Sequence, residues 1–141
     1  MISRQHALNS YIIFFEQMKR EDLVRLPEFF ADQARFKDPF NDVTGIEQIN
    51  KVFHHMFETL DTPKFIIDEA VLESDVAYIK WNFTGVSNAK QLKLVGLSRV
   101  VFNDRGLVSE HVDYWDASEQ FYMKLPVIGS ILRFIRNKAA N

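Results

Sequence analysis

The 141-residue sequence contains no cysteine. The chain therefore has no disulfide, no thiolate ligand for a metal and no thiol nucleophile. The absence of cysteine does not decide between an oxidising and a reducing compartment. Its five glycines form no phosphate-binding loop, no nucleophile elbow around a serine and no dinucleotide fingerprint. Chemistry that depends on a cofactor has no support in this sequence, and we expect no cofactor.

Long apolar runs are also missing from the chain. No stretch approaches the roughly 20 apolar residues that cross a bilayer, and residues 1–17 lack the apolar run and cleavage site of a signal peptide. We therefore expect a cytoplasmic protein without a membrane span. The 17 basic and 19 acidic side chains give a net charge of −2. This balance offers no overall field for attracting nucleic acid, which is not expected as a partner.

Apolar and aromatic residues are abundant instead. Hydrophobic residues make up 47% of the chain, and phenylalanine alone occurs 13 times. A chain of this length buries most of its surface in one core, and a core rich in rings is wide enough to hold an apolar ligand. Without a repeat, a low-complexity tract or a linker, residues 1–141 are expected to form a single domain.

The N-terminal segment has helical periodicity. An apolar stripe recurs every three or four residues, which predicts a helix from an N-cap at Ser3 to about Lys19. The stripe consists of Leu8, Tyr11, Ile12, Phe15 and Met18. A short helical turn is expected next, at residues 21–26.

A strand and a second helix are expected in the following segment. Residues 34–38 alternate as a short strand, and Pro39 ends its pairing because proline lacks an amide donor. Thr44 or Gly45 then begins a helix with apolar residues at helical spacing, and Pro63 stops it.

Four strand-like segments follow Pro63. They are rich in β-branched and aromatic residues, are separated by turn residues, and span 64–72, 76–86, 90–102 and 107–115. Connections of two to four residues can join only antiparallel neighbours. Helices therefore come first and an antiparallel meander follows, which predicts an α+β fold with a strongly curved, mostly antiparallel sheet on the first helix.

The end of the chain has another helical pattern. Residues 117–125 are expected to be helical, Pro126 breaks the pattern, and residues 126–138 form a basic amphipathic helix. Such a helix usually packs on its own domain or on a dimer partner. Contact with a membrane surface and covering of a pocket mouth are the alternatives.

Two segments resemble a known superfamily. Residues 29–45, FFADQARFKDPFNDVTG, resemble the part of ketosteroid isomerases in which the Asp before Pro is the general base, and residues 98–116, SRVVFNDRGLVSEHVDYWD, resemble their C-terminal hairpin. Over roughly residues 3–117 the chain is similar to ketosteroid isomerases, SnoaL-like polyketide cyclases and nuclear-transport-factor-2-like proteins. The resemblance implies a cone-shaped domain with an apolar pocket, and it assigns the role of base to Asp38.

The neighbours of Asp38 suit that role. Phe36 and Phe40 are expected to desolvate the carboxyl partly and raise its pKa, which makes a carboxylate useful as a base near neutral pH. The alternative is structural, because Asp-Pro sequences often stabilise a turn. In that case Asp38 serves the turn with Pro39.

Two further positions matter for an enolate. In ketosteroid isomerases a Tyr on the first helix and a protonated Asp on the third meander strand hold the oxyanion. Tyr11 matches that Tyr if three residues are inserted before Phe30, whereas Phe14 matches without a gap. Ser98 occupies the Asp position, so one donor is missing, and such a loss costs about 3 kcal/mol in barrier. Authentic steroid isomerisation is therefore not expected.

The last strand supplies more candidates. His111, Asp113 and Trp115 share one face by strand alternation, and the resemblance places them in the pocket. Asp113 is then an acid or base partner whose titration is coupled to that of Asp38, with His111 assisting. The alternative, given equal weight, is that His111 and Asp113 hydrogen-bond only each other or the helix above. The expected ligand contacts are Phe36, Trp81, Phe83, Ser98 and Trp115, although an aromatic stripe on a strand is more often plain core.

A metal site is not expected. His54 and His55 are adjacent on the second helix, so their side chains point about 100° apart and do not share a metal in the usual way. No other His, Asp or Glu stands at ligand spacing.

Two functions remain open. The first is a cofactor-independent isomerase, cyclase or hydrolase that acts on a small apolar compound. The second is a non-catalytic domain that binds a ligand or a protein partner. In both cases the outer face of the sheet, with Lys93, Val95, Leu97 and Arg99, mixes apolar and charged groups as the surface of a homodimer does.

Overall fold

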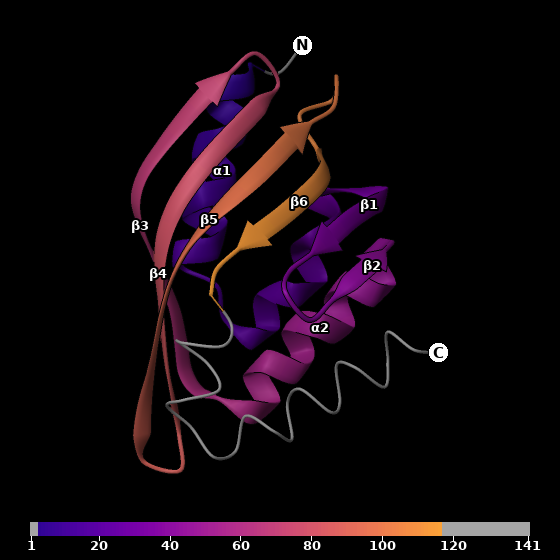
Figure 1. The fold of residues 1–141 in the computed structure, drawn as a ribbon. Helices are drawn as coiled ribbons and strands as arrows, with labels where there is room; N and C mark the ends of the chain where they lie inside the picture. Colours follow the sequence, from indigo (N-terminus) through magenta and orange to yellow (C-terminus); the bar gives the residue numbers. More distant parts are fainter. Residues whose placement is uncertain (1–2, 117–141) are drawn as a thin grey trace.

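The computed structural model describes residues 3–116 (Figure 1). The elements in chain order are α1 (Arg4–Glu16), the 3₁₀ helix η1 (Arg20–Glu28), β1 (Phe30–Lys37), β2 (Asp42–Thr44), α2 (Ile46–Thr59), β3 (Asp61–Glu73), β4 (Val76–Ser87), β5 (Lys90–Phe102) and β6 (Val108–Tyr114). The helices expected at 117–125 and 126–138 lie outside the described residues. None of the helices within 3–116 is long and apolar enough to cross a membrane.

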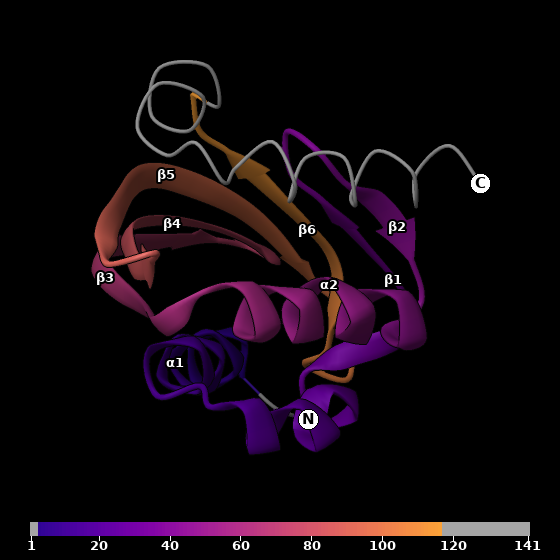
Figure 2. The same ribbon diagram turned by 90° about the horizontal axis from the view of Figure 1, so that it is seen from below.

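The six strands form one sheet with the order β2-β1-β6-β5-β4-β3. All neighbours are antiparallel except β1 and β6, which run parallel. The four long strands form the predicted meander, because their turns are too short for a crossover. Figures 1 and 2 show the sheet curling over α1 and α2 without closing. The predicted α+β class is confirmed.

Helix α1 begins as expected and ends early. The Ser3 hydroxyl accepts the His6 backbone N–H at 3.0 Å, which confirms the N-cap. The helix stops at Glu16 and not near Lys19, because the Lys19 N–H donates to the Asp22 carboxylate at 2.8 Å. That bond opens the next helical segment, so the predicted turn at 21–26 is part of the longer η1.

The prediction that Pro63 stops the second helix was wrong. Helix α2 ends at Thr59, and Pro63 lies inside β3, where the pairing register shifts between Asp61 and Lys64. Proline is tolerated there because β3 is an edge strand. The three-residue strand β2 was also missed, and β1 starts earlier than the predicted strand at 34–38.

The inner face of the sheet makes the core with the two α-helices. Along β5 the buried residues alternate with exposed ones: Leu94, Ser98 and Val100 point inward, and Lys93 and Leu97 point outward, as expected for the outer face. The outer face carries several exposed large apolar side chains, namely Ile66, Val71, Tyr78, Val95, Leu97 and Tyr114. One face is therefore core and the other is a surface with apolar patches.

Candidate functional site

A cavity of about 130 Å³ lies between α2 and the inner face of the sheet. Seven aromatic side chains line it: Phe36, Phe40, Phe53, Phe65, Trp81, Phe83 and Trp115. Its polar lining residues are Asp38, Asn41, His55, Thr59 and Asp113. A second cavity of about 30 Å³ shares Asp113 with the first and reaches Tyr11, Ser98 and His111. All nine predicted site residues therefore line one cavity or the other.

Strand register explains this convergence. On β6, His111 pairs with Phe36 of β1 on one side and with Val100 of β5 on the other. Two residues further along β6, Asp113 pairs with Ser98. Because alternate residues of a strand share a face, all these inward side chains meet under α1 and α2.

Asp38 directly follows the last residue of β1, where its carboxyl bonds to a turn and also faces the cavity. Its Oδ1 accepts the backbone N–H groups of Phe40, at 2.8 Å, and Asn41, at 2.7 Å. The Asn41 side-chain amide donates to Oδ1 and Oδ2 at 3.2 and 3.1 Å. The carboxyl thus holds the turn around Pro39 and also lines the cavity.

The surroundings raise the pKa of Asp38 to about 6. Burial is the largest cause, because it removes water from the charged carboxylate, and the nearby carboxylate of Asp113 adds to it by repulsion between like charges. The hydrogen bonds from Phe40 and Asn41 act in the opposite direction. Burial and repulsion prevail over them, so Asp38 exchanges a proton close to neutral pH.

Asp113 is held by two donors. The Ser98 hydroxyl and the His111 Nε2–H both donate to Oδ1, the latter at 2.7 Å, whereas Oδ2 takes part in neither bond. Since Nε2 of His111 carries the hydrogen, its Nδ1 accepts the Tyr11 hydroxyl at 2.7 Å. The His111 ring is also stacked on Phe36, with ring centroids 4.9 Å apart.

Tyr11 is the helix residue of this network. Its side chain is 2% exposed, and burial, followed by the charge of Asp113, raises the pKa of its phenol well above the ordinary value. The phenol therefore stays protonated and serves as a donor. In this structure it donates to His111, not into the larger cavity.

Ser98 is likewise engaged on both sides. It is 2% exposed, donates to Asp113 and accepts the indole N–H of Trp81 at 2.8 Å. The ring of Trp81 reaches Ser98 across Gly96, where an added Cβ would come within 2.3 Å of the ring. A chain of hydrogen bonds thus runs from Trp81 through Ser98, Asp113 and His111 to Tyr11. In each of these bonds the hydrogen is donated in the direction of the Asp113 carboxylate.

Two residues of the site were missed from the sequence. Asn41 fixes Asp38, and only its place three residues after that Asp hinted at a role. His55 lines the larger cavity from α2, and burial lowers its pKa, so its imidazole is neutral at pH 7. The helical spacing of Val52, His55 and Thr59 on one face could have indicated it.

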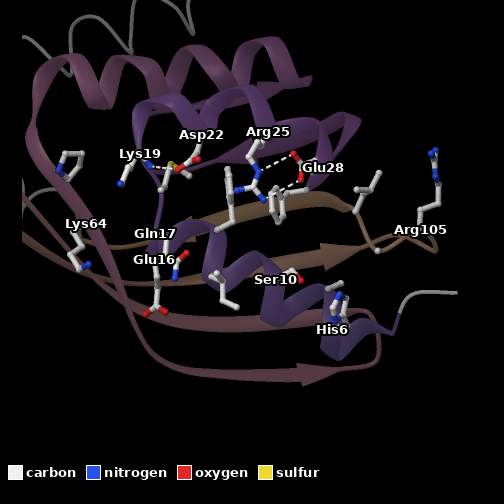
Figure 3. A pocket seen from close by; sticks show the side chains of 18 of the residues that line it. His6, Ser10, Glu16, Gln17, Lys19, Asp22, Arg25, Glu28, Lys64 and Arg105 are labelled. Carbon is white, nitrogen blue, oxygen red and sulfur yellow. Dashed lines mark hydrogen bonds and ion pairs between the residues drawn. The ribbon is translucent and has the colours of Figure 1, made fainter.

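A larger hollow, of about 1010 Å³, lies along α1 and η1 on another part of the surface (Figure 3). Arg25 lies over the rings of Phe14 and Phe29 there and pairs with Glu28 at 3.2 Å. None of the predicted site residues lines this hollow. Across residues 3–116 no group of three or more His, Asp or Glu side chains could hold a metal ion.

Comparison with known proteins places this geometry in a family. A family model described as the SnoaL-like domain matches residues 13–111. No curated protein matches the chain. Among solved structures, TsrD from Streptomyces laurentii is 17% identical, with a TM-score of 0.72 over 89% of this chain and 98% of that chain.

Two further solved structures share the fold. A protein assigned as a SnoaL-like polyketide cyclase, from Jannaschia sp. CCS1, is 15% identical, with a TM-score of 0.71 over 81% of this chain and 88% of its own. An LEH-like epoxide hydrolase of M. tuberculosis is 11% identical, with a TM-score of 0.70 over 92% and 95%. Because the family model covers more than half of the sequence, the chain belongs to the SnoaL-like domain family.

Proposed function

We propose that this protein binds a small apolar ligand inside its cone and exchanges a proton with it through Asp38. The observation that carries the proposal is the carboxyl of Asp38, which lines an apolar cavity and has its pKa raised to about 6. A group with such a pKa is present in both protonation states near neutral pH, as general acid-base catalysis requires. The reaction class is a cofactor-independent isomerase, cyclase or hydrolase type.

The other residues have supporting roles in this proposal. Asp113 supplies the neighbouring charge that raises the pKa of Asp38. His111 and Ser98 hold the Asp113 carboxylate through hydrogen bonds, and Tyr11 fixes the tautomer of His111. We therefore treat His111, Ser98 and Tyr11 as positioning residues and Asp38 as the candidate catalytic residue.

A steroid-type enolate has less support. The two side chains at the oxyanion positions, Tyr11 and Ser98, donate to His111 and Asp113 in this structure. Preorganised donors aimed at the oxyanion are commonly the largest single contribution to such catalysis. The same observation favours the second candidate function, a domain that binds its ligand without chemistry.

A general probe of carboxylate bases tests the proposal. 5-Nitrobenzisoxazole loses its ring C–H proton to a base, the N–O bond breaks, and the coloured cyanophenolate is released. We expect the protein to accelerate this reaction and the rate to rise with pH around a midpoint near 6. Asp38→Asn is expected to lower the rate at least a hundredfold.

The matched control is Asp32→Asn. It removes an exposed carboxyl from β1, the strand that leads to Asp38. Its rate should equal that of the parent protein. Asp113→Asn should shift the midpoint to lower pH, because it removes one cause of the raised pKa. An Asp38→Asn variant as active as the parent would contradict the role of Asp38 as the base and leave binding without chemistry.

A further inference from the structure

In the cavity of about 130 Å³ beneath α2, the charged side chains of the described lining are acidic. Its wall contains two carboxyl groups, from Asp38 and Asp113, and the lining residues found within 3–116 include no Lys or Arg. Both donors on Asp113 reach Oδ1 and not Oδ2. On Asp38, Oδ1 accepts three bonds and Oδ2 accepts one, from Asn41 at 3.1 Å. The carboxylates thus keep acceptor capacity, while the donors that hold them are engaged.

The aromatic part of the wall, like the carboxylates, attracts positive charge. Seven aromatic rings line the cavity, and the face of an aromatic ring carries negative charge density that attracts cations. The neutral imidazole of His55 adds no positive charge at pH 7, because burial lowers its pKa. Within the described lining, nothing compensates the two carboxylates except hydrogen bonds.

We propose that the ligand of this cavity is a small apolar amine bound as its ammonium ion, held between the carboxylates of Asp38 and Asp113 and the surrounding aromatic rings. This inference rests on the proposed function for the location of the site. It adds the charge of the ligand. A carboxylate ligand is disfavoured by the same two side chains, and a neutral ligand of equal shape gains only the apolar contacts.

Ammonium binding is linked to the proton on Asp38. The facing titratable groups are Asp38 from the β1-β2 loop, Asp113 from β6 and His55 from α2, with His111 and Tyr11 behind Asp113. A cation between the carboxylates favours their charged forms, so binding to protonated Asp38 releases that proton to water. At pH 5 about one tenth of Asp38 is ionised if its pKa is about 6, so affinity should be about tenfold weaker than at pH 8.

Three compounds with the same tert-butyl frame test the charge of the ligand. They are 3,3-dimethylbutylamine, 3,3-dimethylbutan-1-ol and 3,3-dimethylbutanoate, titrated into the 141-residue chain at pH 8 and pH 5 and followed by NMR and calorimetry. At pH 8 we expect the amine to bind at least tenfold more tightly than the alcohol, and the carboxylate to bind most weakly. Only the amine should lose affinity at pH 5.

Variants connect the preference to the two carboxyl groups. Asp113→Asn and Asp38→Asn should each reduce the amine-to-alcohol ratio severalfold without weakening the alcohol, and Asp104→Asn, at an exposed turn, should leave the ratio unchanged. Equal or tighter binding of the alcohol or the carboxylate overturns the inference. So does a ratio that neither cavity variant alters, or binding of none of the three compounds.

These outcomes separate the inference from the proposed function. The benzisoxazole probe is neutral and reports on proton transfer, while the tert-butyl series reports on binding without turnover. Base activity without an amine preference refutes only the cation inference. An amine preference without base activity refutes only the proton transfer.

Discussion

Replacing Asp38 by asparagine is expected to stabilise the protein at pH 8 and to have little effect at pH 4. The folded carboxyl has a pKa of about 6, and its ordinary value is 3.8. Between these two values the folded chain holds a proton that the unfolded chain has lost. Stability therefore falls as pH rises through this window, by about 1.4 kcal/mol per pH unit and roughly 3 kcal/mol in total.

An asparagine at this position carries no charge at either pH. Its side-chain oxygen can still accept the N–H groups of Phe40 and Asn41, although a neutral acceptor makes weaker bonds than a carboxylate does. The pKa of about 6 already includes the stronger bonds to the carboxylate, because they lower it, so the expected gain at pH 8 is the full difference of roughly 3 kcal/mol. At pH 4 the parent carboxyl is protonated when folded, so the gain disappears.

Urea unfolding of the parent, Asp38→Asn and Asp32→Asn at pH 4 and pH 8 measures this difference. Asp32 is exposed on β1, and its replacement should change the free energy of unfolding by less than about 0.5 kcal/mol at both pH values. An Asp38→Asn protein that is less stable than the parent at pH 8 would refute the reasoning. Equal effects at the two pH values would show that burial and Asp113 do not raise the pKa of this carboxyl.

Three other changes have definite expected outcomes. Gly96→Ala should destabilise the fold by about 1 to 3 kcal/mol and alter tryptophan fluorescence, because its Cβ would lie 2.3 Å from the Trp81 ring; unchanged fluorescence in the folded variant would contradict this contact. Tyr11→Phe should lower the free energy of unfolding in urea by about 1 to 2 kcal/mol, because His111 loses its only side-chain donor within residues 3–116. The NMR signals of the imidazole nitrogens should also change, and an unaltered spectrum would argue against the bond. If two copies pair through the outer face of the sheet, Leu97→Lys should convert a dimer to a monomer in sedimentation velocity, and a parent protein that is already monomeric excludes that pairing.

The sequence predicted the architecture well because its signals are local. Helical periodicity, the Ser3 cap and strand alternation each act within a few residues, so the start of α1 and the outer face of β5 were predicted. The predictions failed where contacts between distant parts of the chain decide the local structure. Pro63 ends no helix, because it belongs to an edge strand whose outer side needs no partner.

The candidate site was predicted residue by residue and not as a network. Strand parity brought His111 and Asp113 to one face, and the Asp-Pro motif pointed to Asp38. Parity cannot show that Ser98 donates to Asp113, or that Tyr11 donates to His111, since these bonds join residues 15 and 100 positions apart. His55 was missed because its role follows from where α2 crosses the sheet.

The sequence by itself therefore determined the α+β class, the single apolar core and the identity of the acid before Pro39. Only the tertiary structure decided the chemistry of that acid. Its pKa depends on burial beneath α2 and on a second carboxyl contributed by β6, 75 residues further along the chain. Electrostatic energy depends on distance in space and on local solvation, and neither quantity is written in the spacing of residues along a chain.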